Sequence, residues 1–244
     1  SILPKNIKMV FFRTVFNVVA MILYFGVIPM MPIAEAGAGL FTSPIFALLF
    51  SVIIFKEKIS LRQLFSFVLG LIGVFLILGT KFSNLTIYHI IPILAGASYA
   101  SGSLITNRYC KDEKPLALLF FFLIAIGLTG FLVTIWFTFY PVDIKHLQDA
   151  PFIFKSWQST NSYYWGIMIF LGLSAALAIY FIIVAYQICK PSYSSIYEYT
   201  YLISAGFFGW FIWGEIPNLL SILGIIAIVL AGANIALSKA EVET

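Results

Sequence analysis

The sequence predicts an all-α membrane protein built as a polytopic bundle of transmembrane helices. Of its 244 residues, 61% are hydrophobic and only 10% are charged, against about 25% in soluble domains. The mean hydropathy is +1.02, and no water-soluble fold has enough interior to hide that much apolar surface. The apolar stretches have the length of helices and lack the period-two alternation of barrel strands, so a helical bundle is expected.

The number of crossings follows from segment length, because a spanning helix needs about 20 largely apolar residues. Charged or turn-forming residues separate the apolar segments, and the longest connection, Pro141 to Ser162, is a polar loop. The sequence predicts eight spans: Thr14–Met31, Ala36–Phe55, Leu64–Gly79, Tyr88–Asn107, Leu116–Tyr140, Tyr163–Ile188, Tyr193–Trp213 and Leu219–Ser238. A signal peptide at the first segment is the alternative, but its apolar run is too long and seven more spans follow.

The placement of Lys and Arg predicts the orientation in the membrane. With a cytoplasmic N-terminus, eleven of the 14 basic residues fall on the inner side. The three outer ones are Lys81, Lys145 and Lys155. Both termini are therefore expected in the cytoplasm. Cys110 and Cys189 fall at inner helix ends, where we expect no disulfide.

Several function classes are disfavoured by the same residues. The pI near 9.0 does not indicate nucleic-acid binding, because Lys and Arg form no dense patch. His89 and His146 lie too far apart in the sequence to show metal-ligand spacing, and no phosphate-binding glycine motif occurs. We expect no metal, no cofactor and no catalytic constellation, so the chain is predicted not to be an enzyme.

Two stretches of the chain resemble each other and predict an inverted repeat. Each has an apolar span, a Glu at its exit (Glu57 and Glu215), a short turn, and a second span rich in small residues. The predicted topology places Glu57 inside and Glu215 outside. Repeats of opposite orientation with a site between them are typical of secondary transporters.

The motifs of both stretches resemble EamA-type transporters of the drug/metabolite transporter superfamily. Thr42-Ser43-Pro44 and Lys56-Glu57-Lys58 resemble the first repeat. Ala185-Tyr186-Gln187, Tyr197-Glu198-Tyr199-Thr200 and the run Gly209 to Pro217 resemble the second, closest to the branch with S-adenosylmethionine and riboflavin uptake carriers. The resemblance implies two inverted repeats of five helices. It assigns 1–80 to an incomplete first repeat of three helices and 81–244 to a second of five, so we expect a fragment that lacks the first two helices.

The function that the resemblance implies is secondary-active or facilitative transport of a small organic metabolite by alternating access, in a bacterial inner membrane. Amino-acid-like, nucleoside-like and vitamin substrates stay open, as do direction, coupling ion and oligomeric state. One alternative is a membrane-embedded lipid-modifying enzyme, for which the sequence lacks a cluster of His, Asp or Glu at one membrane face. The other is a membrane scaffold that transports nothing.

Ionisable groups at membrane depth are costly and mark candidate sites. Glu198 lies inside a predicted span between two tyrosines. It is either a site carboxylate, for a proton or a cationic substrate group, or a hydrated carboxylate near the inner surface. Glu35 is a second candidate for proton coupling, although a helix-start carboxylate beside water is favoured. For Arg13, snorkelling to the surface is the favoured interpretation.

Polar and aromatic side chains within the spans are candidates for a central cavity, because lipid would leave their donors unsatisfied. Pro44 should free the carbonyl of Leu40 and bend the second span. The candidate substrate-binding residues are Glu198, Tyr199, Tyr24, Asn17, Thr42, Ser98, Tyr99, Tyr186 and Trp210.

Overall fold

The computed structural model describes residues 3–30, 33–56, 58, 60–78, 88, 90–140, 159–189, 194, 197–200, 204, 207, 208, 211 and 219–240. All regular structure in these residues is helical, as predicted. The helices are α1 (Ile7–Val27), α2 (Ile33–Leu40), α3 (Ser43–Ile53), α4 (Leu61–Leu78), α5 (Ile90–Tyr109), α6 (Pro115–Phe139), α9 (Ser162–Ile188) and α12 (Leu219–Ala240).

The first helix begins earlier than the apolar pattern indicates. α1 starts at Ile7 because Asn6 caps it, accepting a hydrogen bond from the amide of Met9. Lys8 and Arg13 are therefore helical residues rather than a flank of the predicted span Thr14–Met31. A short 3-10 helix, Ile28–Met30, follows α1.

The predicted span Ala36–Phe55 is two helices and not one. α2 ends at Leu40. Thr42 is the N-cap residue of α3 without a side-chain capping bond, and Pro44 lies in the first turn of α3. Proline has no amide hydrogen and suits the start of a helix, so the bend expected there is a complete break. The break packs on α5, where a Cβ on Gly96 would lie 2.8 Å from the Thr42 hydroxyl.

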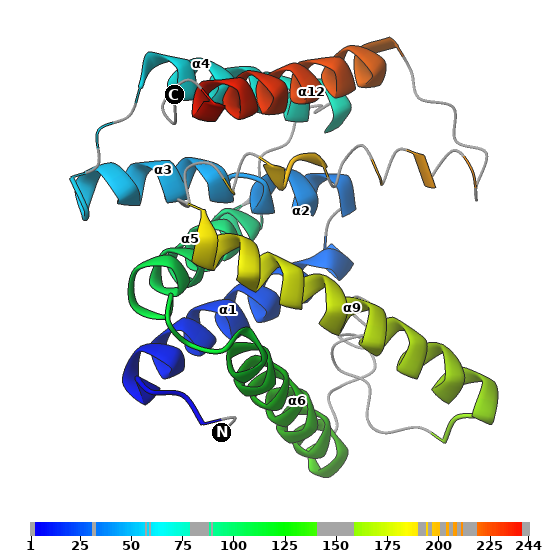
Figure 1. Ribbon diagram of the computed structural model, residues 1–244. Coiled ribbons are helices and arrows are strands. Elements are labelled where there is room, and N and C mark those ends of the chain that lie inside the picture. The colour runs from blue at the N-terminus through cyan, green and yellow to red at the C-terminus, as the bar shows by residue number, and fades with distance from the viewer. Residues whose placement is uncertain are drawn as a thin grey trace.

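α4 and α12 lie side by side, far apart in sequence but adjacent at the top of Figure 1. Small residues allow the close approach, since a Cβ on Gly73 would lie 2.7 Å from the carbonyl oxygen of Gly224. Polar side chains also cross between them: Asn234 donates to Ser66 Oγ at 2.7 Å and accepts from Arg62 Nε at 3.2 Å.

The outer surface is that of an integral membrane protein. Within the described residues, α1, α6 and α9 are each long and apolar enough to cross a bilayer. α6 and α9 extend away from the rest of the bundle in Figure 1 and expose large apolar side chains, among them Phe131, Leu132 and Phe170. α5 is more polar and is enclosed by α1, α2, α3 and α9. Its Ser, Thr and Asn side chains bond to backbone carbonyls, for example Ser98 to Phe16 at 2.9 Å.

Candidate functional site

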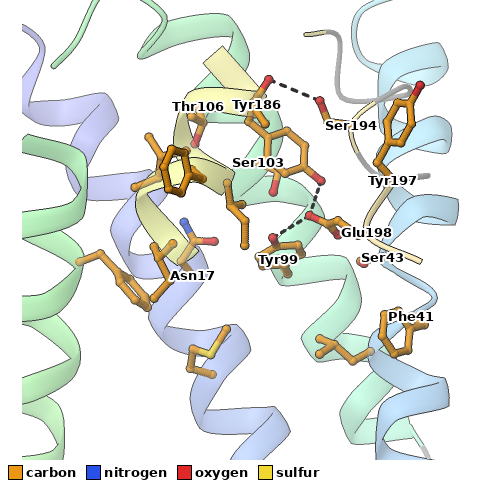
Figure 2. Close-up of a pocket in the computed structure, with 18 of the residues that line it drawn as sticks. Asn17, Phe41, Ser43, Tyr99, Ser103, Thr106, Tyr186, Ser194, Tyr197 and Glu198 are labelled. Atoms are coloured by element: carbon orange, nitrogen blue, oxygen red, sulfur yellow. Dashed lines mark hydrogen bonds between the residues drawn. The ribbon is translucent and has the colours of Figure 1, made fainter. Parts of the chain in front are cut away.

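A cavity of about 670 Å³ lies between α1, the α2–α3 break, α5, α6, α9 and the described residues of 194–204. Its wall is mostly apolar, with a few polar groups that point inward (Figure 2). Size and composition are those of small-molecule sites, which range over about 300–1,000 Å³. The polar groups come from five parts of the chain and include Asn17, Ser43, Tyr99, Thr106, Tyr186 and Glu198.

The Glu198 carboxylate is held by two tyrosines from different helices (Figure 2). The Tyr99 hydroxyl of α5 donates to Oε1 at 2.8 Å, and the Tyr186 hydroxyl of α9 donates to the same oxygen at 2.9 Å. Oε2 has no hydrogen bond within the described part of the chain. One carboxylate oxygen is thus fixed by two phenols.

Arg13 corrects an expectation from the sequence, because it is buried in the bundle instead of snorkelling to the surface. The side chain is 4% exposed and lines the cavity. Nε donates to the hydroxyl of Thr106 at 2.9 Å, and Nη1 donates to the carbonyl oxygen of Leu118 at 3.2 Å. Packing of α5 and α6 against α1 brings these neutral acceptors to the guanidinium, which water at the membrane surface would otherwise solvate.

Asn17 follows Arg13 by one helical turn and faces the same cavity. It is 8% exposed, and in the described residues its amide has no hydrogen-bond partner. It rests against Gly102 of α5, where a Cβ would lie 2.6 Å from Asn17 Oδ1. Only a residue without a side chain leaves room for the amide in this position.

The structure brings together five of the residues predicted to bind substrate: Asn17, Tyr24, Tyr99, Tyr186 and Glu198 line the cavity. Others lie elsewhere. The Thr42 hydroxyl donates to the carbonyl oxygen of Gly39 at 2.6 Å, and Ser98 faces α1. Tyr199 is fully buried against Phe67, Val74 and Ile228. Trp210 and the side chain of Glu35 lie outside the described residues.

Sequence reasoning missed several polar lining residues: Ser43, Ser103, Thr106, Ser194, Tyr197, Thr200 and Ser204. Tyr99, Ser103 and Thr106 are spaced by four and three positions, so they share one face of α5. That spacing was a usable signal, but several faces of α5 carry Ser or Thr and the spacing alone does not choose among them.

A dense group of hydrogen bonds, which we term the turn cluster, lies beside the Arg13 end of the cavity. It consists of Asn107, Glu113 and Gln187. Gln187 Nε2 donates to the carbonyl oxygens of Cys110 (2.7 Å) and Glu113 (2.8 Å). Asn107 Nδ2 donates to those of Tyr186 and Cys189, both at 2.8 Å.

The Glu113 carboxylate completes the turn cluster by holding the start of α1. It accepts from the backbone amides of Lys5 (2.9 Å) and Asn6 (2.6 Å). A carboxylate at a helix start also interacts favourably with the helix dipole. The cluster therefore ties α1, the α5–α6 turn and the end of α9 together.

Comparison with known proteins relates the first part of the chain to a transporter family. Residues 1–79 match the EamA-like transporter family. A riboflavin transporter of Brucella anthropi is 26% identical over 188 residues, covering 77% of this chain and 62% of that protein. An S-adenosylmethionine uptake transporter of Rickettsia prowazekii is 24% identical over 210 residues, covering 85% of this chain and 64% of that protein. The chain thus spans less than two thirds of the length of these relatives.

The fold itself has a counterpart among solved structures. One solved crystal structure of a protein superposes on this chain with a TM-score of 0.74 and 16% sequence identity. The match covers 98% of this chain and 79% of the chain in that crystal structure. At this identity the match speaks to the fold alone. The family match over residues 1–79 and the named transporters bear out the resemblance predicted from the sequence motifs.

Proposed function

We propose that this chain is an EamA-type transporter of the drug/metabolite transporter superfamily and that it carries a small organic metabolite across the membrane by alternating access. The observation that supports this most directly is the cavity of about 670 Å³ with few inward polar groups. A buried, hydrophobic wall with sparse polar contacts suits a ligand that must bind and then leave. The relatives named as riboflavin and S-adenosylmethionine transporters support the same class of cargo.

The turn cluster is the proposed gate at one end of the cavity. Gln187 follows the cavity residue Tyr186 on α9, and Asn107 follows the cavity residue Thr106 on α5. A shift of α9 against α5 would therefore break the turn cluster and move the cavity wall at the same time. The same helices also meet through an apolar cluster that includes Val10, Leu118 and Ile183, and packed helices can slide past one another in a shear motion. Alternating access then consists of opening this end while the opposite end closes.

The topology is proposed to be two repeats of opposite orientation, 1–80 and 81–244, in a bacterial inner membrane with both termini in the cytoplasm. The pairing of α4 with α12, the last described helix of each repeat, supports this symmetry. Reporter fusions in the turns at Glu57 and Glu215 test it. Opposite sides are expected, and fusions on the same side would contradict the inverted repeat.

Coupling to protons is proposed to run through Glu198, with Glu35 as the second candidate. Glu198 faces Tyr99 from α5, Tyr186 from α9 and Ser43 from α3, and Arg13 on α1 is the other charged group of the wall. Glu198→Gln keeps the size and removes the titration. We expect the variant to lose the pH dependence of uptake, and an unchanged pH profile would reject coupling at this residue.

Uptake by reconstituted proteoliposomes tests the transport proposal. The probes are radiolabelled riboflavin, S-adenosylmethionine and a panel of amino acids, with protein-free liposomes as the blank. The matched control is Gly127→Ala on α6, where an added methyl group has nothing within 4 Å. Saturable uptake of at least one probe is expected for the parent chain and this control. No uptake of any probe by well-folded protein would reject carrier function.

A further inference from the structure

Four lysines from two parts of the chain gather beside the turn cluster. Lys5 and Lys8 lie at the start of α1, and Lys111 and Lys114 lie on the turn between α5 and α6. The Glu113 carboxylate accepts a hydrogen bond from the backbone amide of Lys5 at 2.9 Å, which brings the two parts together at the left of Figure 1. All four lysines are exposed, and we term them the lysine patch.

The lysine patch carries a positive charge that the described residues do not neutralise. None of its four ammonium groups forms an ion pair within the described part of the chain. Two carboxylates share the turn. Asp112 is exposed, whereas Glu113 is buried and faces the backbone amides at the start of α1. Because four ammonium groups stand against two carboxylates, this surface stays positive and attracts an anion.

Exposed apolar side chains continue from the lysine patch along both helices. On α1, Phe11 follows Lys8 by three positions and therefore shares its face. On α6, which begins directly after Lys114, Leu116 and Phe120 are one turn apart and exposed. α1 and α6 pack against each other, and both are long and apolar enough to cross a bilayer. The surface is thus cationic at the helix starts and faces acyl chains along the helices.

We propose that this surface binds an anionic phospholipid, with the headgroup phosphate on the lysine patch and the acyl chains along α1 and α6. Charge complementarity selects the headgroup, because ammonium groups form strong charge-assisted hydrogen bonds to phosphate oxygens. The apolar faces select a lipid over a free anion, which would leave them unused. Clusters of about four to eight basic residues beside the cytoplasmic end of a membrane helix are typical of such recognition.

The lipid site is separate from the cavity, since none of the four lysines lines it. A lipid bound here bridges the start of α1 and the α5–α6 turn on the outside, as the Glu113 carboxylate does on the inside. It therefore stabilises the same junction as the turn cluster. Occupancy of the site is measurable both as bound lipid and as an increase in the Tm of the protein.

Native mass spectrometry of the purified full chain in detergent micelles counts the bound lipids, and thermal unfolding in the same detergent measures the Tm. The probes are phosphatidylglycerol, phosphatidylcholine with the same acyl chains, and inorganic phosphate. We expect phosphatidylglycerol to bind about tenfold more tightly than phosphatidylcholine and to raise the Tm. Inorganic phosphate at the same concentration should leave the Tm unchanged. Equal binding of the two lipids, or an equal increase in Tm with inorganic phosphate, would overturn the proposal.

Charge variants locate the site. The double variant Lys8→Gln/Lys114→Gln removes one exposed ammonium group from each helix start, so the Tm without lipid should not change. Its binding of phosphatidylglycerol should weaken about tenfold, and its binding of phosphatidylcholine should stay the same. Lys111→Gln, on the exposed turn, is a milder variant with a several-fold loss expected.

The matched control is Lys56→Gln/Lys58→Gln, which removes two exposed charges from the segment after α3. It should keep the parent affinity for phosphatidylglycerol, because Glu57 lies between these lysines in the sequence and offsets their charge. A loss in this control as large as in Lys8→Gln/Lys114→Gln would show general charge attraction and contradict the site. Unchanged binding of phosphatidylglycerol in both Lys8→Gln/Lys114→Gln and Lys111→Gln would contradict it as well.

Discussion

The turn cluster and the cavity wall contain the same kinds of side chain, used in opposite ways. In the turn cluster the amide nitrogens of Asn107 and Gln187 each donate two hydrogen bonds to backbone carbonyls. In the cavity the Asn17 amide has no partner in the described residues, although it is just as buried. Buried polar groups are normally satisfied. The hydroxyls of Thr14, Ser51 and Tyr199 are buried without a partner in the described residues and lie outside the cavity lining. Asn17 differs from them because it lines the cavity, where a ligand could bind its amide.

The largest expected effect concerns Gln187. Gln187→Leu removes the side-chain donor from the carbonyls of Cys110 and Glu113. The backbone amide of Glu113 still donates to Cys110, so the Glu113 carbonyl is the group that loses its donor among the described residues. An unsatisfied buried group costs about 1–3 kcal/mol, so the free energy of unfolding should fall by about 2–3 kcal/mol. Reversible unfolding in mixed micelles measures it.

The matched control is Asn17→Leu in the cavity. It removes an amide with no hydrogen-bond partner among the described residues, so stability should be unchanged or rise by about 1 kcal/mol while uptake by proteoliposomes weakens. Equal destabilisation by Asn17→Leu and Gln187→Leu would remove the distinction between the two regions.

The next largest loss of stability is expected for a substitution of Glu113. Glu113→Ala removes the acceptor of two backbone amides at the start of α1. Lys5 and Asn6 are exposed, so water replaces part of the loss and the cost is about 1–2 kcal/mol. Thermal unfolding measures the loss of stability in Glu113→Ala. The control is Asp112→Ala on the same turn, where the side chain is exposed and no change is expected. A loss from Asp112→Ala as large as that from Glu113→Ala would point to general charge effects instead.

Gly102→Ala sharpens the comparison on the cavity side. The new methyl group would lie 2.6–2.9 Å from the amide atoms of Asn17 and must push them aside. Because Ala also favours the helix, stability should stay within about 1 kcal/mol. Uptake by proteoliposomes should weaken several-fold, whereas Gly127→Ala on α6 leaves it unchanged. Unaltered uptake in Gly102→Ala would mean that Asn17 does not contact the transported molecule.

The smallest effect is a pH dependence at Cys110, outside the helices and next to the turn cluster. Burial raises the pKa of the Cys110 thiol to about 11 from 9.0. The folded state thus favours the neutral thiol. The resulting contribution to the free energy of unfolding is fully present below pH 9 and is lost as the pH rises toward 11. At pH 8, maleimide should label the partly exposed Cys189 first, as read by mass spectrometry. Faster labelling of Cys110 would contradict its burial.

The sequence predicted the helices well where apolar length decides them, and less well where capping or a break decides them. Hydropathy located α6 and α9 within a residue or two. It placed the start of α1 too late, since the cap at Asn6 lies among polar residues. Pro44 indicated a bend, but packing of the α2–α3 break on α5 determined that the helix stops.

The candidate site shows the same division. Polar residues within apolar spans pointed to Asn17, Tyr99, Tyr186 and Glu198, since any such residue needs a partner or a cavity. Tyr199 was grouped with its neighbour Glu198, yet consecutive helical positions point about 100° apart. Glu198 therefore faces the cavity while Tyr199 packs against α4.

By itself, the sequence determined that this protein is a helical membrane protein with polar side chains that lipid does not solvate. Composition and segment length are sufficient for this, because so much apolar surface in helix-length segments must face lipid. Only the tertiary structure decided which of those side chains are satisfied and which stay open. Arg13 is the clearest case: its place near a helix start suggested the membrane surface, and the approach of Thr106 and Leu118 from other helices made it a buried cation on the cavity wall. Hydrogen-bond partners distant in sequence are set by packing, which no local pattern encodes.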